Sequence, residues 1–317
     1  MRLYLLHLDD ALESQPDFIR ACQNAGAEVI GVTEGARAIR LWGKQQTLDD
    51  FREALEKQLT GDRAEPRLTF MGSGDFHHLT TFLVALALEN QSAPITLIHF
   101  DNHPDWVKFE NGMHCGSWIN HVLAHPKVEK IITLGVCSRD LTRPEWKGAN
   151  LTLLSQGLLE LYPYDHAPSR VKRDYGSCAS FAQTDGALHW KTISSLGEQN
   201  FTDHLLSRIK TQSVYLTIDK DVLAREDAIT NWDQGSMRMP YLLSLVKEIG
   251  RRHAVIGADV TGDYSTPRYS GDLWTRLSKH AEIFMDQPRG KPDQAQAVNI
   301  NSAANHALLK VLSAVMA

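Results

Sequence analysis

The stretch that decides the fold reads Ile95-Thr96-Leu97-Ile98-His99-Phe100-Asp101-Asn102-His103-Pro104-Asp105-Trp106. Its first half, Ile95 to Phe100, is an apolar run of the length and residue type expected for a buried β-strand. Asp101, His103 and Asp105 follow at alternate positions, and alternate residues of an extended chain point to one side. A polar loop after a strand is one explanation. The other is a divalent metal, because such groups repel or stay unsatisfied unless a cation lies between them.

Two other predicted strands also end in residues that bind metals. The strand 68–71 continues into Gly72-Ser73-Gly74-Asp75-Phe76-His77-His78, and the strand 214–218 ends in Asp219-Lys220-Asp221. Because open parallel sheets bind ligands at the carboxyl ends of their strands, we expect all three segments to meet at one edge. Mixed carboxylate and imidazole ligation suits manganese, iron or zinc better than calcium. Four carboxylates and two imidazoles match two divalent ions, which can share a water when they lie about 3.5–4 Å apart.

Strands and helices alternate along the chain. We expect strands at 2–8, 27–32, 68–71, 95–100, 130–136, 214–218 and 253–259, and helices at 14–24, 47–59, 79–88, 118–123, 199–209, 240–251, 273–284 and 303–315. Thr47 is expected to cap the second helix and Gly61 to end it. This order predicts an α/β fold whose mainly parallel sheet is covered by helices on both faces. Residues from about 140 to 190 show no clear periodicity, which predicts an elaborated loop region or a small subdomain within one domain spanning 1–317.

The composition excludes several classes of function. The chain has 317 residues, 43% hydrophobic and 22% charged, which is typical of a soluble globular protein. Its net charge is −5 and no basic block stands out, so wholesale binding to nucleic acid or an anionic membrane is not expected. The four cysteines are widely spaced without a C-x-x-C pair, which argues against a cysteine zinc site or a disulfide framework. No apolar run is long enough for a signal peptide or a membrane span, and we expect a cytoplasmic protein.

Together these motifs resemble the arginase-like, or ureohydrolase, superfamily. Its members carry a G-G-D-H-type turn, a D-A-H-x-D strand end and a D-x-D strand end in this chain order. Here they correspond to Gly72–His77, Asp101–Asp105 and Asp219–Asp221. The resemblance implies a three-layer α/β/α sandwich with a binuclear manganese centre at the strand ends. It also implies a small-molecule substrate, and family members often form homo-oligomers.

The resemblance implies a role for each matching residue. Asp101 and Asp219 would bridge two metal ions, most simply Mn²⁺. His77 and Asp105 would complete one site, and His103 and Asp221 the other, so that the metal ligands are His77, Asp101, His103, Asp105, Asp219 and Asp221. His114 resembles the family histidine that shuttles protons near the leaving group, although an unpaired loop histidine is the alternative. We therefore assign catalytic roles to His114 and Asp105.

Two departures from the family pattern bear on the ligands and the substrate. An extra residue, Phe76, leaves both His77 and His78 as candidate ligands. Arginases and agmatinases follow a Gly-x-Asp segment with a glutamate that binds the substrate guanidinium, and here that position is Gly262. A guanidinium needs a well-placed carboxylate, which argues against arginine and agmatine as substrates. Asp263, one position further on, could serve a differently shaped cation.

Two segments are candidates for the pocket wall. Trp232, in Asn231-Trp232-Asp233-Gln234-Gly235-Ser236, could contact substrate at the rim or simply pack within a turn. The aromatic and basic residues of the middle segment could wall the pocket or lie on the solvated surface: Trp146, Tyr162, Tyr164, His166, Arg170, Lys172, Arg173 and Tyr175.

The resulting hypothesis is a binuclear metal-dependent hydrolase. It would cleave a C–N bond of a small amidine, guanidine or amide through a metal-bridging hydroxide. A metal-containing binding protein without turnover is the alternative. A nucleotide-binding protein is disfavoured, because His77 occupies the last glycine position of G-x-G-x-x-G and no G-K-[ST] loop is present.

Overall fold

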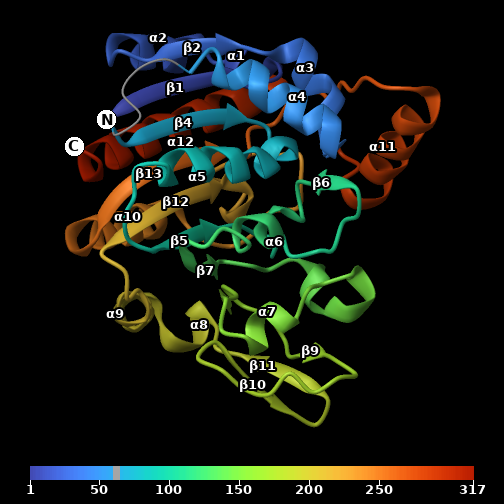
Figure 1. Ribbon diagram of the computed structural model, residues 1–317, viewed down its shortest axis with the longest axis vertical. Helices are drawn as coiled ribbons and strands as arrows, with labels where there is room; N and C mark the ends of the chain where they lie inside the picture. The colour runs from blue at the N-terminus through green and yellow to red at the C-terminus, as the bar shows by residue number, and fades with distance from the viewer. Residues whose placement is uncertain (60–64) are drawn as a thin grey trace.

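The described residues, 1–59 and 65–317 of this computed structural model, form a central eight-stranded sheet (Figure 1). Each neighbouring pair of strands in the sheet is parallel, which confirms the predicted mainly parallel sheet. In spatial order the strands are β2 (Glu28–Gly31), β1 (Arg2–His7), β4 (Arg67–Gly72), β13 (Ala254–Thr261), β12 (Ser213–Asp219), β5 (Ile95–Phe100), β7 (Val128–Leu134) and β8 (Leu159–Tyr162).

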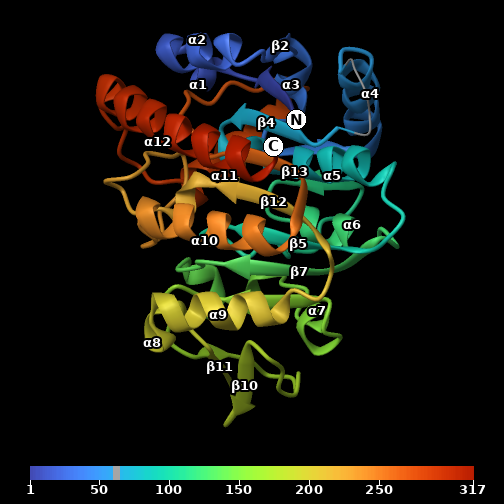
Figure 2. The ribbon, with the colours of Figure 1, turned by 90° about the vertical axis from the view of Figure 1, so that its left-hand side faces the viewer.

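Helices cover both faces of the sheet and make three layers (Figure 2). Alternate strand residues enter two separate hydrophobic cores: Leu5 and Phe70 belong to one, Tyr4 and Met71 to the other. The first core packs against α2 (Pro16–Asn24), α9 (Glu198–Arg208), α10 (Met239–Arg252) and α12 (Gln294–Val315). The second packs against α3 (Thr33–Ile39), α4 (Gln45–Glu56), α5 (Thr80–Leu88), α6 (Trp118–Val122) and α7 (Thr152–Ser155). The predicted three-layer α/β/α architecture is therefore confirmed.

Short elements lie at the ends of the sheet. Figure 1 shows α11 (Leu273–Asp286) at one side of the molecule, near β6 (Gly112–His114), which pairs with β3 (Trp42–Lys44) in a two-stranded antiparallel sheet. A small antiparallel sheet of β9 (Ser169–Arg170), β10 (Phe181–Thr184) and β11 (Ala187–Trp190) lies beyond the edge of the central sheet that β8 forms (Figure 1). The other short elements are α1 (Asp10–Glu13), α8 (Ile193–Leu196), and the 3-10 turns η1 (Gly74–Leu79), η2 (Arg139–Leu141), η3 (Pro144–Lys147) and η4 (Lys220–Val222).

Several predicted boundaries change. The region from 140 to 190 supplies the edge strand β8 as well as the small sheet, so it is more than a loop. Helix α4 begins at Gln45 with no side-chain cap, so the prediction that Thr47 caps it is wrong: Thr47 lies inside the first turn. Gly61, expected to end that helix, lies outside the described residues. Helix α12 begins at Gln294, well before the predicted position of 303. Asp293 caps it by accepting the backbone N–H of Gln296.

Within residues 1–59 and 65–317, no helix combines the length and the apolar composition needed to cross a lipid bilayer.

A buried ionic network fastens the edge strand β8 to its neighbours. Glu160 is 4% exposed and accepts hydrogen bonds from Lys130 Nζ at 2.8 Å and Arg208 Nη2 at 2.7 Å. Tyr162 Oη donates to the second carboxylate oxygen at 2.8 Å. Burial alone would raise the pKa of Glu160, but Arg208, Lys130 and Tyr162 outweigh it and lower that pKa to about 2. The charged carboxylate is therefore favoured in the folded state.

We expect Glu160→Gln to lower the free energy of unfolding by about 3 kcal/mol at pH 7, because it leaves the buried Lys130 ammonium and the partly exposed Arg208 guanidinium without their carboxylate. The folded pKa of Glu160 lies below its unfolded value, so its stabilisation is complete above about pH 4.5 and is lost as the pH falls toward 2. Urea unfolding of the wild type and the variant between pH 2 and 7 measures this effect. The difference between their free energies of unfolding should shrink as the pH falls from about 4.5 toward 2.

The matched control is Glu53→Gln, since Glu53 forms an exposed i,i+4 ion pair with Lys57. Such pairs contribute little to stability, so this change should leave the free energy of unfolding close to that of the wild type. Equal effects of the two substitutions would contradict the role given to the Glu160 network.

Candidate metal centre

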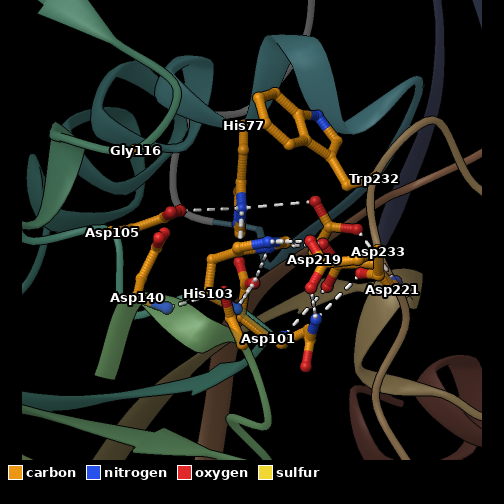
Figure 3. Close-up of polar contacts among 12 residues, drawn as sticks. His77, Asp101, His103, Asp105, Gly116, Asp140, Asp219, Asp221, Trp232 and Asp233 are labelled. Atoms are coloured by element: carbon orange, nitrogen blue, oxygen red, sulfur yellow. Dashed lines mark hydrogen bonds and ion pairs between the residues drawn. The ribbon is translucent and has the colours of Figure 1, made fainter. Parts of the chain in front are cut away.

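The sheet topology brings the predicted metal residues together. Strands β5 and β12 are neighbours in register, with Phe100 opposite Ile218, so Asp101 and Asp219 follow at the same level. The turn η1, which carries His77, follows β4 and lies against Asp219: a Cβ built on Gly74 would be 2.5 Å from Asp219 Oδ2. Glycine at position 74 is therefore required for this close approach. Figure 3 shows side chains from these segments pointing toward one another.

One cluster consists of His77, His99, Asp101 and Asp105, all buried, with one ligand-type atom of each within 4.8 Å of the others. His77 Nδ1 lies 3.1 Å from Asp101 Oδ2 and 3.3 Å from Asp105 Oδ2. Asp105 holds a left-handed backbone conformation with φ of 49°, and its Oδ2 accepts the Trp118 indole N–H at 2.6 Å. Asp tolerates this conformation better than most residues.

A second cluster shares Asp101 with the first and adds His103 and Asp221. His103 Nδ1 lies 2.8 Å from Asp221 Oδ2, and its Nε2 lies 2.8 Å from Asp233 Oδ1 (Figure 3). Asp219 lies beside both clusters: its Oδ2 is 3.6 Å from His77 Nδ1, and its Oδ1 accepts the backbone N–H of Asp221. The structure thus brings all six predicted ligands to one place.

The hydrogen bonds around His77 define which ring nitrogen carries the proton. Thr217 Oγ1 donates to Asp259 Oδ1 at 2.7 Å, so it can only accept from His77 Nε2, 2.8 Å away. In the neutral ring the Nδ1 atom then carries a lone pair. This buried Nδ1 makes no hydrogen bond and faces three carboxylates, the arrangement that a metal ion between them would stabilise. The donor set therefore fits divalent ions.

Burial and mutual repulsion dominate the electrostatics of the carboxylates. Burial, followed by repulsion from Asp101, raises the pKa of Asp105 and raises that of Asp219 to about 7. The pKa of Asp221 rises well above its usual value for the same reasons. Burial also opposes charge on Asp101, but the imidazoles of His99 and His103 hold its pKa well below normal. A cation among these groups would relieve the repulsion.

The clusters open into a cavity of about 660 Å³, a size suited to a small organic molecule. All six predicted ligands line this cavity, together with His114, Trp232 and Glu282. Trp232 packs edge-on against the His103 ring, 5.6 Å between centroids, and donates its indole N–H to Asp75 at 2.9 Å. It therefore combines both predicted alternatives, a packed side chain and a part of the cavity wall.

His114 lies in the same cavity as a neutral tautomer. Its Nδ1 accepts the backbone N–H of Gly116 at 2.8 Å, so the ring proton is on Nε2, which donates to Glu282 Oε1 at 2.5 Å. A Cβ built on Gly116 would lie 3.2 Å from His114 Nδ1 and 3.7 Å from Asp105 Oδ1, so the imidazole borders the metal cluster.

Asp263 lies elsewhere. Its carboxylate is 1% exposed, pairs with Lys220 Nζ and accepts from Asn305, and it is not among the cavity-lining residues. Gly262 has a φ of 91°, and a Cβ there would be 2.3 Å from Asp219 Oδ1. A side chain at position 262 would therefore displace a metal-type carboxylate. The structure does not place Asp263 where it could contact a substrate in this cavity.

The aromatic and basic residues singled out in the middle segment do not form the cavity wall, which was one of the two alternatives considered for them. Among the described lining residues this segment supplies Asp140 and Lys147, which follow Ser138 and Arg139 along the cavity wall. None of the lining residues belongs to the aromatic and basic set considered from the sequence: Trp146, Tyr162, Tyr164, His166, Arg170, Lys172, Arg173 and Tyr175. Tyr162 is fully buried in the core instead, whereas Trp146 is 68% exposed.

Sequence reasoning missed three polar residues at the site. His99 shares the face of Asp101 on β5, a signal that the alternation rule could have given, and its Nε2 lies 2.8 Å from Asp101 Oδ2. Asp75 accepts from Arg40, Trp232 and Gln287 and so ties the η1 turn to the cavity wall. Glu282 comes from α11, and nothing in the local sequence marks it.

Comparison with known proteins supports the fold. No family model matches the sequence. A protein of Thermotoga maritima described as uncharacterized is 26% identical over 196 residues, and the match spans 62% of this chain and 58% of that protein. The chain thus matches little more than half of this relative's length.

Solved structures give a consistent result. Arginase from Bacillus caldovelox superimposes with a TM-score of 0.59 at 12% identity, covering 97% of both chains. Proclavaminate amidino hydrolase from Streptomyces clavuligerus gives 0.56 at 14% identity, covering 96% of this chain and 92% of that one. Formimidoylglutamase from Bacillus subtilis gives 0.53 at 14%, covering 97% and 87%. The protein therefore has the arginase-like fold that its motifs predicted.

The two candidate histidines of the η1 turn can be separated by experiment. His77 faces the carboxylates, whereas His78 is buried outside both clusters, and burial holds its pKa well below normal. We expect His77→Ala to lose at least about one manganese equivalent per chain, because a ligand is removed. His78→Ala should keep the wild-type content.

Elemental analysis after manganese incubation and gel filtration measures both variants, with thermal melting as the check of folding. Loss of metal from a folded His78→Ala protein, with His77→Ala unaffected, would reverse the assignment.

Proposed function

We propose that this protein is a binuclear metal-dependent hydrolase that cleaves a C–N bond of a small amidine, guanidine or amide. The observation that carries the proposal is the His77 Nδ1 lone pair, buried and facing Asp101, Asp105 and Asp219 at 3.1–3.6 Å beside a cavity. Similarity to an amidino hydrolase and an arginase supports it through the shared fold.

We assign Asp101 and Asp219 as the bridging ligands. His77 and Asp105 would complete one metal site, and His103 and Asp221 the other. The membership of Asp101 in both clusters supports this division. Mixed carboxylate and imidazole ligands suit manganese, iron or zinc better than calcium, and the resemblance to the ureohydrolase superfamily favours Mn²⁺ among these. When bound, two such ions would lower the pKa of a water shared between them, so that hydroxide is available at neutral pH.

The chain's own residues would then orient the reactants. Trp118 fixes the Asp105 carboxylate, and Thr217 with Asp259 fixes the His77 ring. His114 borders Asp105 and holds its proton on Nε2, where it could be passed to a leaving amine. The paired state of Asp263 and the crowded position of Gly262 remove both carboxylate positions considered for an arginine-type substrate.

The direct test is hydrolysis by the manganese-loaded protein across a panel of amidines, guanidines and amides, followed by ammonia or amine release. We expect turnover of at least one class. His114→Ala should lower kcat by about 10²–10⁴-fold while manganese content is unchanged, because a proton-transfer group is lost.

Asp140→Asn is the matched control, because Asp140 lines the cavity but belongs to neither cluster. Its rate should stay near that of the wild type. Two bound metal ions without hydrolysis of any panel member would instead indicate a metal-containing binding protein.

A further inference from the structure

Glu282 is a carboxylate in the cavity wall that has no role in the hydrolysis proposed above. It lies on α11, remote in sequence from the three metal motifs, and its side chain is 19% exposed. Each carboxylate oxygen receives one donor: His114 Nε2 at 2.5 Å on Oε1, and Trp42 Nε1 at 3.1 Å on Oε2. The two donors fix the carboxylate where it lines the cavity.

This carboxylate keeps unused acceptor capacity. An ionised carboxylate offers about four lone-pair sites, and His114 and Trp42 occupy two of them, one on each oxygen. One site on each oxygen is left for a partner. Two parallel N–H groups of a planar cation match such a pair of acceptors.

Glu282 also differs from its acidic neighbours in its direct contacts. Among the described acids that line the cavity outside the metal clusters, Asp140 and Asp286 lie near Lys147, and Asp233 contacts His103. Among the described residues, the hydrogen-bond partners of Glu282 are a neutral imidazole and an indole, because Nδ1 of His114 accepts the Gly116 N–H. Lys279, on the same helix, donates to the carbonyl of Ala38, and its ammonium acts on Glu282 through space without a direct ion pair.

We propose that Glu282 binds the planar cationic group of the substrate, an amidinium or guanidinium, and so determines specificity. The inference rests on the proposed function. The His114 imidazole separates Glu282 from Gly116 and Asp105, so a cation held by Glu282 lies one side chain away from the metal cluster. A carboxylate from helix α11 thus takes the role that the crowded strand end at Gly262 cannot provide.

The test compares benzamidinium with its neutral isostere benzamide as ligands of the manganese-loaded full chain, by titration calorimetry or ligand-observed NMR. The wild type should bind benzamidinium at least about tenfold more tightly than benzamide, as expected for one charge-assisted pair. Glu282→Gln should abolish that preference and leave benzamide affinity unchanged. Asp286→Asn is the matched control on the same helix and should keep the preference.

Two results would overturn the proposal. One is an unchanged benzamidinium preference in Glu282→Gln. The other is an equal loss in Asp286→Asn, which would indicate a general field rather than a specific contact. If Glu282→Gln does not fold, a crystal structure of the wild type soaked with benzamidinium provides the test. An amidinium in contact with Glu282 supports the proposal, and an amidinium bound elsewhere contradicts it.

Manganese content, measured on the same samples, separates this inference from the proposed function. A wild type that binds two ions and hydrolyses amidines, yet shows no benzamidinium preference, refutes the role of Glu282 alone. A wild type without manganese refutes the hydrolase, whatever it binds.

Discussion

Four carboxylates, of Asp101, Asp105, Asp219 and Asp221, are buried side by side at the carboxyl ends of parallel strands. Burial and mutual repulsion raise the pKa of Asp105, Asp219 and Asp221, and neighbouring imidazoles outweigh these effects only at Asp101. Such an arrangement is unfavourable unless cations compensate for it. The tight turn before His77, the ordered tautomer of its ring and the glycines packed against Asp219 are all consistent with a site built to hold divalent ions.

Crowding around Asp219 also explains why position 262 carries glycine where arginases and agmatinases carry a glutamate. Gly74 and Gly262 both press against Asp219, so the end of β13 has no room for a large acidic side chain. Asp263, the nearest carboxylate in sequence, is directed to Lys220 and Asn305 and stabilises the packing of α12. The far wall is supplied by α11, which brings Glu282 to His114 and Trp42. The carboxylate proposed for recognition and the predicted metal ligands thus come from segments widely separated in the chain.

Much of this could be predicted from local patterns. The apolar runs ending in Asp101-x-His103-x-Asp105 and Asp219-x-Asp221 gave the strands, their parallel order and the edge where the ligands meet, since strand alternation is a local property. His99 obeys the same rule and was overlooked because it lies inside the apolar run. Glu282 and the pairing of Asp263 with Lys220 depend on contacts between residues more than 40 positions apart, which no periodicity encodes. The edge strand β8 was missed because short, isolated strands in a loop-rich region carry little periodic signal.

The most direct test of the central claim is anomalous X-ray scattering at the manganese edge from crystals of the manganese-loaded protein. Two peaks about 3.5–4 Å apart, both in contact with Asp101, are the expected result. A single peak, or none among Asp101, Asp105, Asp219 and Asp221, would contradict a binuclear centre.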